Sequence, residues 1–129
     1  RRGGDRLARE GLLRNSDVAG LDNGARLPVI SALTCLINYY EYPGLAALGE
    51  LLTLNPGGGA VAVWAPTGLS FNSQAVALNE TLFRIVFQEG SDSLGEAIRD
   101  TLAETPLTRP FMGLTYTLLG DPAVIPHIP

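Results

Sequence analysis

Reactive and charged side chains of several kinds are scarce in this 129-residue sequence, which has one cysteine, one histidine and no lysine. A single thiol excludes an internal disulfide, and one cysteine with one histidine provides too few soft ligands for a metal site. No apolar run approaches the ~20 residues that a membrane-spanning helix needs. The net charge is −4 with scattered acidic residues, whereas a nucleic-acid-binding surface needs clustered basic residues. We therefore expect no cofactor, no metal, no nucleic-acid partner and no membrane span.

The residues that are abundant are apolar. Hydrophobic residues make up 46% of the chain and charged residues 17%, which is typical of a small globular domain with apolar surface that another domain or chain can cover. The sequence begins Arg1-Arg2-Gly3-Gly4-Asp5, with neither an initiator methionine nor the apolar segment of a signal peptide. This beginning predicts a fragment or a processed product.

The middle of the chain has the pattern of a strand–helix–strand unit. The stretch from Arg26 to Thr34 is apolar on both faces and bounded by turn residues, which is typical of a buried strand. Leucines at helical spacing predict a helix over 45–54, and the run 55–59 of Asn, Pro and Gly ends it. Residues 60–65 form a second apolar run. Short connections of this kind require parallel strands and a right-handed crossover.

The glycines of that connection, Gly57-Gly58-Gly59, do not predict a phosphate site. No Lys-Ser/Thr pair follows them, and they precede a strand, whereas a phosphate-binding loop leads from a strand into a helix. They predict a structural loop between a helix and a strand.

The flanking segments predict mainly helices. The expected elements are a short helix around Leu7 to Leu13, a turn of helix over 17–21, a long helix over 71–89, and a helix to about Glu104 that the capping box Ser93–Glu96 opens. Residues 111–119 fit either a helix or a strand, Asp121 predicts an Asx turn, and the tail 123–129 is too rich in proline for a central strand.

The cysteine, Cys35, lies where the first apolar run gives way to a loop rich in tyrosine. Catalytic groups of open α/β sheets gather at the carboxyl ends of strands, and the loop Pro66–Ser70 leaves the second strand at that same edge. A free cysteine in an apolar run is, however, usually a small buried hydrophobe. From the residues alone, Cys35 is either a core residue or a nucleophile.

The histidine, His127, is a poor partner for this cysteine. A Cys–His pair is the usual means of generating a thiolate nucleophile, but His127 lies in a tail flanked by proline without an apolar anchor. We do not expect it to be the general base.

The order of the pieces along the chain, taken together, resembles the gingipain family of cysteine peptidases. The resemblance covers the chain from about Asp5 to Ile125, and the pieces that carry it are Leu27-Pro28-Val29-Ile30-Ser31-Ala32-Leu33-Thr34-Cys35, Leu48-Gly49-Glu50-Leu51-Leu52, Gly59-Ala60-Val61-Ala62-Val63-Trp64-Ala65-Pro66-Thr67-Gly68, Ser93-Leu94-Gly95-Glu96-Ala97 and Leu118-Leu119-Gly120-Asp121-Pro122.

The resemblance implies an α/β fold, a caspase-like three-layer αβα arrangement with a parallel sheet, present here as a partial domain. Residues 1–129 would be the carboxyl-terminal half of a peptidase domain, with a polar segment at 1–26 and a tail at 123–129. By the family pattern Cys35 would be the catalytic nucleophile, attacking peptide bonds and forming a thioester. The loop up to Phe71 would wall the substrate pocket, with Thr67, Gly68, Ser70 and Phe71 as substrate-binding residues. Backbone N–H groups near Cys35 would stabilise the oxyanion.

One departure from the family pattern concerns the general base. The family places a His-Gly pair shortly before a segment like 5–8, where this chain has Arg1-Arg2-Gly3-Gly4. An arginine beside a thiol can attract a thiolate but can neither accept nor return a proton. We therefore expect a peptidase of peptide or protein substrates that needs the N-terminal half of its domain, and no activity of the isolated chain. The family resemblance further implies a secreted or cell-surface protein.

Two alternatives stay open. The first is a non-catalytic binding or secretion-associated module with a degenerate peptidase fold, which the absent base favours. The second is another α/β hydrolase or transferase in which Cys35 is only a core residue.

Overall fold

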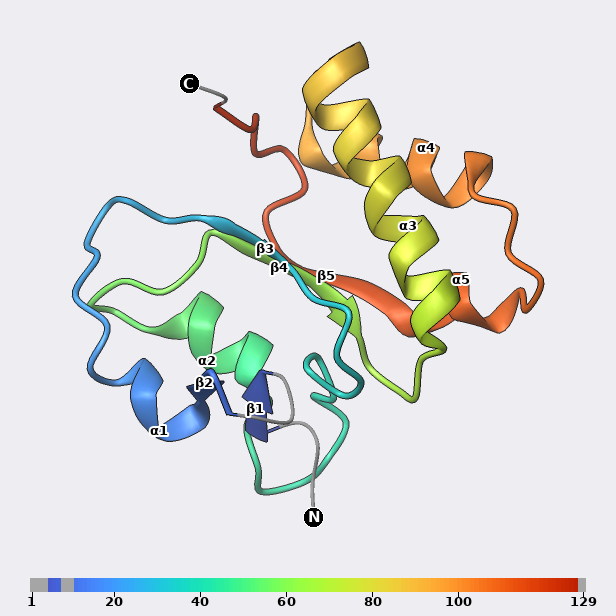
Figure 1. Cartoon of the computed structure of the whole chain (residues 1–129). Coiled ribbons are helices and arrows are strands. Elements are labelled where there is room, and N and C mark those ends of the chain that lie inside the picture. The colour runs from blue at the N-terminus through green and yellow to red at the C-terminus, as the bar shows by residue number, and fades with distance from the viewer. Residues whose placement is uncertain (1–4, 8–10, 128–129) are drawn as a thin grey trace.

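A computed structural model describes residues 5–7 and 11–127 of the chain. Its centre is a three-stranded sheet in the order β3 (Val29–Ser31), β4 (Ala62–Pro66) and β5 (Tyr116–Gly120) (Figure 1). The strands β3 and β4 pair in parallel, with Ile30 opposite Val63, so the predicted strand–helix–strand unit is confirmed. Its helix, α2 (Leu48–Leu54), crosses between them.

The third strand makes the sheet mixed, whereas a parallel sheet was expected. The helix α5 (Phe111–Thr115) ends directly before β5, and Tyr116 pairs with Pro66 at the carboxyl end of β4. Because the chain enters the sheet from that end, β5 runs antiparallel to β4. The stretch 111–119, which the sequence left open between helix and strand, is thus a helix followed by a strand.

Helices cover both faces of β4, and its side chains alternate between two cores. Ala62 and Trp64 pack with α3 (Asn72–Arg84), α4 (Leu94–Glu104) and α5. Val63 and Ala65 face the other side, where α1 (Asn15–Val18) and α2 lie. Every residue of β4 is buried, whereas the three residues of β3 are half-buried. The mixed α/β class is therefore confirmed, with β4 at the centre of the packing.

Local signals in the carboxyl-terminal part give the expected structure. The predicted helix over 71–89 is α3 continued by a π-helical segment, η2 (Ile85–Glu89). The Ser93 hydroxyl accepts the Glu96 N–H at 3.2 Å, which caps α4 as predicted. The Asp121 carboxylate accepts the Ala123 N–H at 2.8 Å and forms the Asx turn.

The amino-terminal part differs from the expectation. In place of a helix around Leu7 to Leu13, β1 (Arg6–Leu7) and β2 (Leu13–Arg14) pair in antiparallel fashion. Residue Gly11, at φ +71°, lies in the turn between them. Residues 1–4, where the sequence departs from the family pattern, lie outside the described residues, as do the last two residues of the tail.

Two smaller features concern α2 and its connection to β4. The Glu50 carboxylate accepts the Ala47 N–H at 2.8 Å and so caps α2. The glycine run forms the predicted structural loop, in which the Asn23 side chain accepts the Gly59 N–H at 2.7 Å.

Among the described residues, no helix is long and apolar enough to cross a bilayer.

Candidate active site

The turn over residues 35–38, which we call the cysteine turn, and the loop 66–71 meet at one edge of the sheet. Cys35 follows β3 and the loop follows β4, and since these strands are parallel, both segments leave the sheet at the same end (Figure 1). The side chain of Cys35 is half-buried and is a free thiol. It is therefore not enclosed in the core, which disfavours the interpretation of Cys35 as a core residue alone.

The polar contacts of the Cys35 sulfur go to Ser70. The Ser70 backbone N–H donates to Sγ at 3.3 Å, and the Ser70 hydroxyl lies 3.2 Å from it. The thiol can donate to the Ser70 carbonyl at 3.6 Å. The Ser70 hydroxyl also lies 3.4 Å from the Leu33 carbonyl, to which it can donate. The structure thus joins the cysteine to one of the predicted pocket residues directly.

The other predicted pocket residues lie along the same loop, in different roles. The Gly68 carbonyl accepts the N–H of Leu36, the residue after the cysteine, at 3.2 Å. Both the N–H and the hydroxyl of Thr67 donate to the Thr115 carbonyl, at 2.8 and 3.1 Å. Thr67 therefore attaches the loop to the start of β5, while Gly68 and Ser70 contact the cysteine turn.

Phe71 ends the loop in a partly exposed aromatic cluster. Its ring, on a residue that is 44% exposed, lies 6.0 Å from that of Phe111 in an edge-to-face arrangement. The Arg109 guanidinium carbon is 4.4 Å from the centre of the Phe71 ring. The Phe71 N–H donates to the sulfur of Met112 at 3.5 Å, and Met112 is fully buried. The backbone of the predicted residue Phe71 is thus held by the buried Met112, and one face of its ring contacts Arg109.

Tyr116 lies close to the cysteine from the core side. Its hydroxyl donates to the Ala32 carbonyl at 3.3 Å, and its ring lies 4.9 Å from that of Trp64. Burial raises the pKa of Tyr116 to about 12, and the electrostatic interaction with nearby Cys35 acts in the same direction. A phenol that stays protonated at neutral pH cannot accept the thiol proton, so Tyr116 is not the general base.

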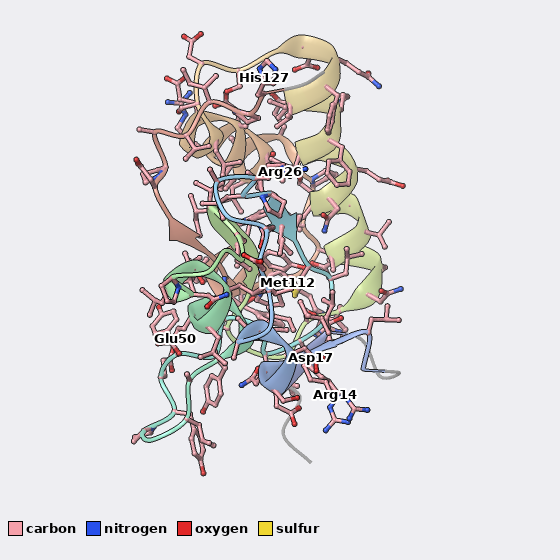
Figure 2. All side chains as sticks on the ribbon, turned by 90° about the vertical axis from the view of Figure 1, so that its left-hand side faces the viewer. Arg14, Asp17, Arg26, Glu50, Met112 and His127 are labelled. Atoms are coloured by element: carbon pink, nitrogen blue, oxygen red, sulfur yellow. The ribbon has the colours of Figure 1, made fainter. Side chains whose placement is uncertain are left out.

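The single histidine lies elsewhere. His127 lines a hollow together with Leu27, Pro28 and Gly59, which precede β3 and β4 and so mark the amino ends of these strands. Figure 2 shows His127 at one end of the molecule and Arg26 between it and Met112, which contacts the loop 66–71. The expectation that His127 is not the base agrees with this placement. Within residues 5–7 and 11–127 there is also no cluster of His, Cys, Asp or Glu that could hold a metal ion.

Comparison with known proteins shows the family. The sequence model of Peptidase family C25 matches residues 3–127. The chain belongs to peptidase family C25. The resemblance to gingipains is therefore confirmed, whereas a search of curated proteins found no match.

Solved structures of peptidases have a similar fold. The Arg-specific cysteine proteinase gingipain R (RgpB) is 17% identical, with a TM-score of 0.83 over 95% of this chain and 31% of that chain. The complex of RgpB pro- and mature domains from Porphyromonas gingivalis gives 18% identity and a TM-score of 0.82 over 95% and 32% of the two chains. A further protease gives 17% and 0.77 over 97% and 34%. This C25 chain thus spans about a third of the length of these structures.

Two residues of the cysteine turn were not found from the sequence. Leu36 has φ +66°, which is the left-handed region that a leucine rarely adopts. Asn38, in the tyrosine-rich loop that begins after Cys35, is fully buried and donates hydrogen bonds to the neighbouring strands. No local pattern predicts either feature, because both depend on segments that are distant in the sequence.

Proposed function

We propose that the complete protein is a cysteine-type endopeptidase with Cys35 as its nucleophile. The observation that carries this proposal is the position of the Cys35 sulfur, half-buried at the carboxyl edge of a parallel strand pair and in contact with Ser70 of the loop after β4. Membership of family C25 supports the reaction class. The substrates would be peptides or proteins.

The reaction would proceed through a thioester. The sulfur attacks the carbonyl carbon of the scissile peptide and forms a C–S bond, and the C–N bond then breaks as the amine leaves with the thiol proton. Water hydrolyses the thioester, which releases the acid and restores the thiol. No acceptor among the described residues takes the Cys35 backbone N–H, and we assign this group as a donor to the oxyanion. Thr67, Gly68, Ser70 and Phe71 would form the wall of the substrate pocket.

The proton acceptor would come from an upstream segment that completes the domain. β3 is an edge strand of its sheet, with half-buried side chains. Beside it lies a hollow of about 820 Å³ whose apolar lining includes Leu13, Leu21, Ile30 and Leu52. A strand ending in a histidine, paired with β3, would cover this surface and bring an imidazole to the cysteine edge. The complete sheet would then have the caspase-like three-layer arrangement, and residues 1–129 would be its carboxyl-terminal half.

The location proposed for the complete protein is outside the cell or on its surface. This part of the proposal rests on the likeness to gingipain-family peptidases alone.

A second candidate function is a non-catalytic binding module with a degenerate peptidase fold. It is favoured by one observation, the position of the only histidine at the opposite end of β3 from Cys35. In this case the upstream segment would complete the sheet without supplying a base.

Labelling with peptidyl chloromethyl ketones distinguishes the two functions. In the full-length protein we expect Cys35 to be labelled much faster than free cysteine, because a bound peptide and a base assist the reaction, and we expect Cys35→Ala to abolish labelling. The isolated chain should be labelled slowly and should not hydrolyse peptides. Labelling of the full-length protein at the rate of free cysteine would leave the binding module as the function.

A further inference from the structure

We propose that Asn38 is a positioning residue for Cys35, which fixes the cysteine turn to β4 and β5 and so holds the sulfur at the edge of the sheet. This inference rests on the proposed function of Cys35. It assigns a role to a residue that contacts neither the sulfur nor the expected substrate.

The side chain of Asn38 connects the cysteine turn to two strands. Its amide nitrogen donates to the carbonyls of Val63 and Thr117 at 3.1 and 3.0 Å, with a longer contact of 3.4 Å to that of Ala65. Its backbone N–H donates to the Pro66 carbonyl at 3.2 Å. A primary amide has only two hydrogens, so both are engaged by strand carbonyls.

The buried position of Asn38 is not explained by packing alone. The residue is 0% exposed, and its side-chain oxygen has no hydrogen-bond partner among the described residues. A buried polar atom without a partner destabilises a fold. The oxygen is accommodated because position 49 is a glycine, where a Cβ would lie 1.9 Å from it. An apolar side chain would avoid the unpaired oxygen, so the donor contacts are what an asparagine supplies here.

The turn that Asn38 holds is strained next to the nucleophile. Leu36 directly follows Cys35 and has φ +66°, and its N–H donates to the Gly68 carbonyl at 3.2 Å. A non-glycine residue keeps such a conformation only when the surrounding structure fixes it. Two sets of hydrogen bonds hold the turn. Leu36 donates to the Gly68 carbonyl, and the Asn38 side chain donates to carbonyls of β4 and β5. These contacts determine where the sulfur lies relative to Ser70.

Positioning of this kind affects one class of reagent more than another. A small alkylating agent such as iodoacetamide needs only an accessible thiol. A peptidyl chloromethyl ketone also needs the sulfur aligned with a peptide bound at the edge of the sheet, and an error of an ångström in alignment lowers such rates about 100-fold. The ratio of the two rates therefore reports the position of the sulfur.

The test compares Asn38→Ala with Asn79→Ala in the full-length protein. Asn79 is a matched control, because it is 5% exposed and donates from its side chain to the Ala75 carbonyl at 3.1 Å, but it contacts β3 and α3 instead of the cysteine turn. We expect Asn38→Ala to lower the rate with the peptidyl reagent at least about tenfold and that with iodoacetamide less than about twofold. Asn79→Ala should leave both rates unchanged at the same folded fraction. Equal peptidyl rates in the two variants would overturn the proposal.

A second pair of variants guards against loss of folding in Asn38→Ala. Glycine adopts φ +66° without strain, so Leu36→Gly removes the strain that the contacts of Asn38 oppose and should allow Leu36→Gly/Asn38→Ala to fold. We expect the double variant to react with the peptidyl reagent at least about tenfold more slowly than Leu36→Gly alone. Equal rates would refute the role of Asn38.

The outcome for the unmodified protein separates the two proposals. Slow labelling of Cys35 by the peptidyl reagent contradicts the peptidase function and the positioning role together. Fast labelling that Asn38→Ala does not change contradicts the positioning role and leaves the peptidase function standing.

Discussion

The two strands of the parallel pair differ in how far the structure surrounds them. All residues of β4 are buried, because β3 and β5 flank it and helices cover both of its faces. The residues of β3 are half-buried, and within the described part of the chain a strand pairs with β3 on one side only. Cys35 follows the less covered strand, and Ser70 follows the covered one. The candidate site thus lies between the well-packed strand β4 and the open edge of β3. We propose that an upstream segment pairs with this open edge.

The largest expected effect tests the covered strand. Trp64→Ala should lower the free energy of unfolding by about 4 kcal/mol, because Trp64 is fully buried and its removal leaves a large cavity against α3 and α4. Urea denaturation followed by circular dichroism measures the change. Leu69→Ala is the control, since Leu69 is 74% exposed and its truncation should change stability little. Similar losses for both variants would contradict the central position of β4.

A matched pair of valines compares the two strands directly. Val63 in β4 is 0% exposed, whereas Val29 in β3 is half-buried. Val63→Ala should destabilise the isolated chain by about 2 kcal/mol and Val29→Ala by clearly less, because less apolar surface is lost from contact. In the full-length protein the two losses should become similar if an upstream strand covers β3. A difference that persists there would argue against completion of the sheet at this edge.

The alkaline pH dependence of stability tests the burial of Tyr116 beside the site. The folded pKa of about 12 lies above the ordinary value of 10. Between these values the unfolded chain loses the phenolic proton while the folded chain keeps it, so stability is full below pH 10 and falls as pH rises toward 12. Urea denaturation across this range should show the fall, and Tyr116→Phe should reduce it. An unchanged slope in that variant would assign the alkaline loss to other groups.

What could be predicted from the sequence is what local patterns determine. Apolar runs and short connections predicted the β3–α2–β4 unit, and the Ser93 and Asp121 patterns predicted a cap and a turn that the structure contains. The pairing of β1 with β2 was missed because the apolar spacing around Gly11 fits a helix, while the chain reverses at this glycine. β5 was ambiguous because its extended form depends on pairing with β4.

The candidate site shows the same division. Cys35 and the loop 66–71 could be located because they follow two recognisable strands and match a family pattern. The buried state of Asn38 and the left-handed backbone of Leu36 could not, since they depend on carbonyls of Val63, Thr117 and Gly68 that lie far away in the sequence.

The smallest expected effect concerns Arg109, which contacts Phe71 at the end of the loop that follows the covered strand β4. Its guanidinium carbon lies 4.4 Å from the ring centre, and its backbone N–H donates to the Gln74 side chain at 3.2 Å, which holds the loop on α3. Arg109→Gln should lower the free energy of unfolding by about 0.5–1 kcal/mol, the range of an exposed cation–π contact. Arg99→Gln makes the same change of charge at an arginine that pairs with its neighbour Asp100, and it should have almost no effect. Thermal unfolding of both variants measures the difference. If Arg99→Gln destabilises the chain as much as Arg109→Gln, the loss reflects the removed charge and not the contact with Phe71. The stability of the region around β4 then comes from its buried core alone.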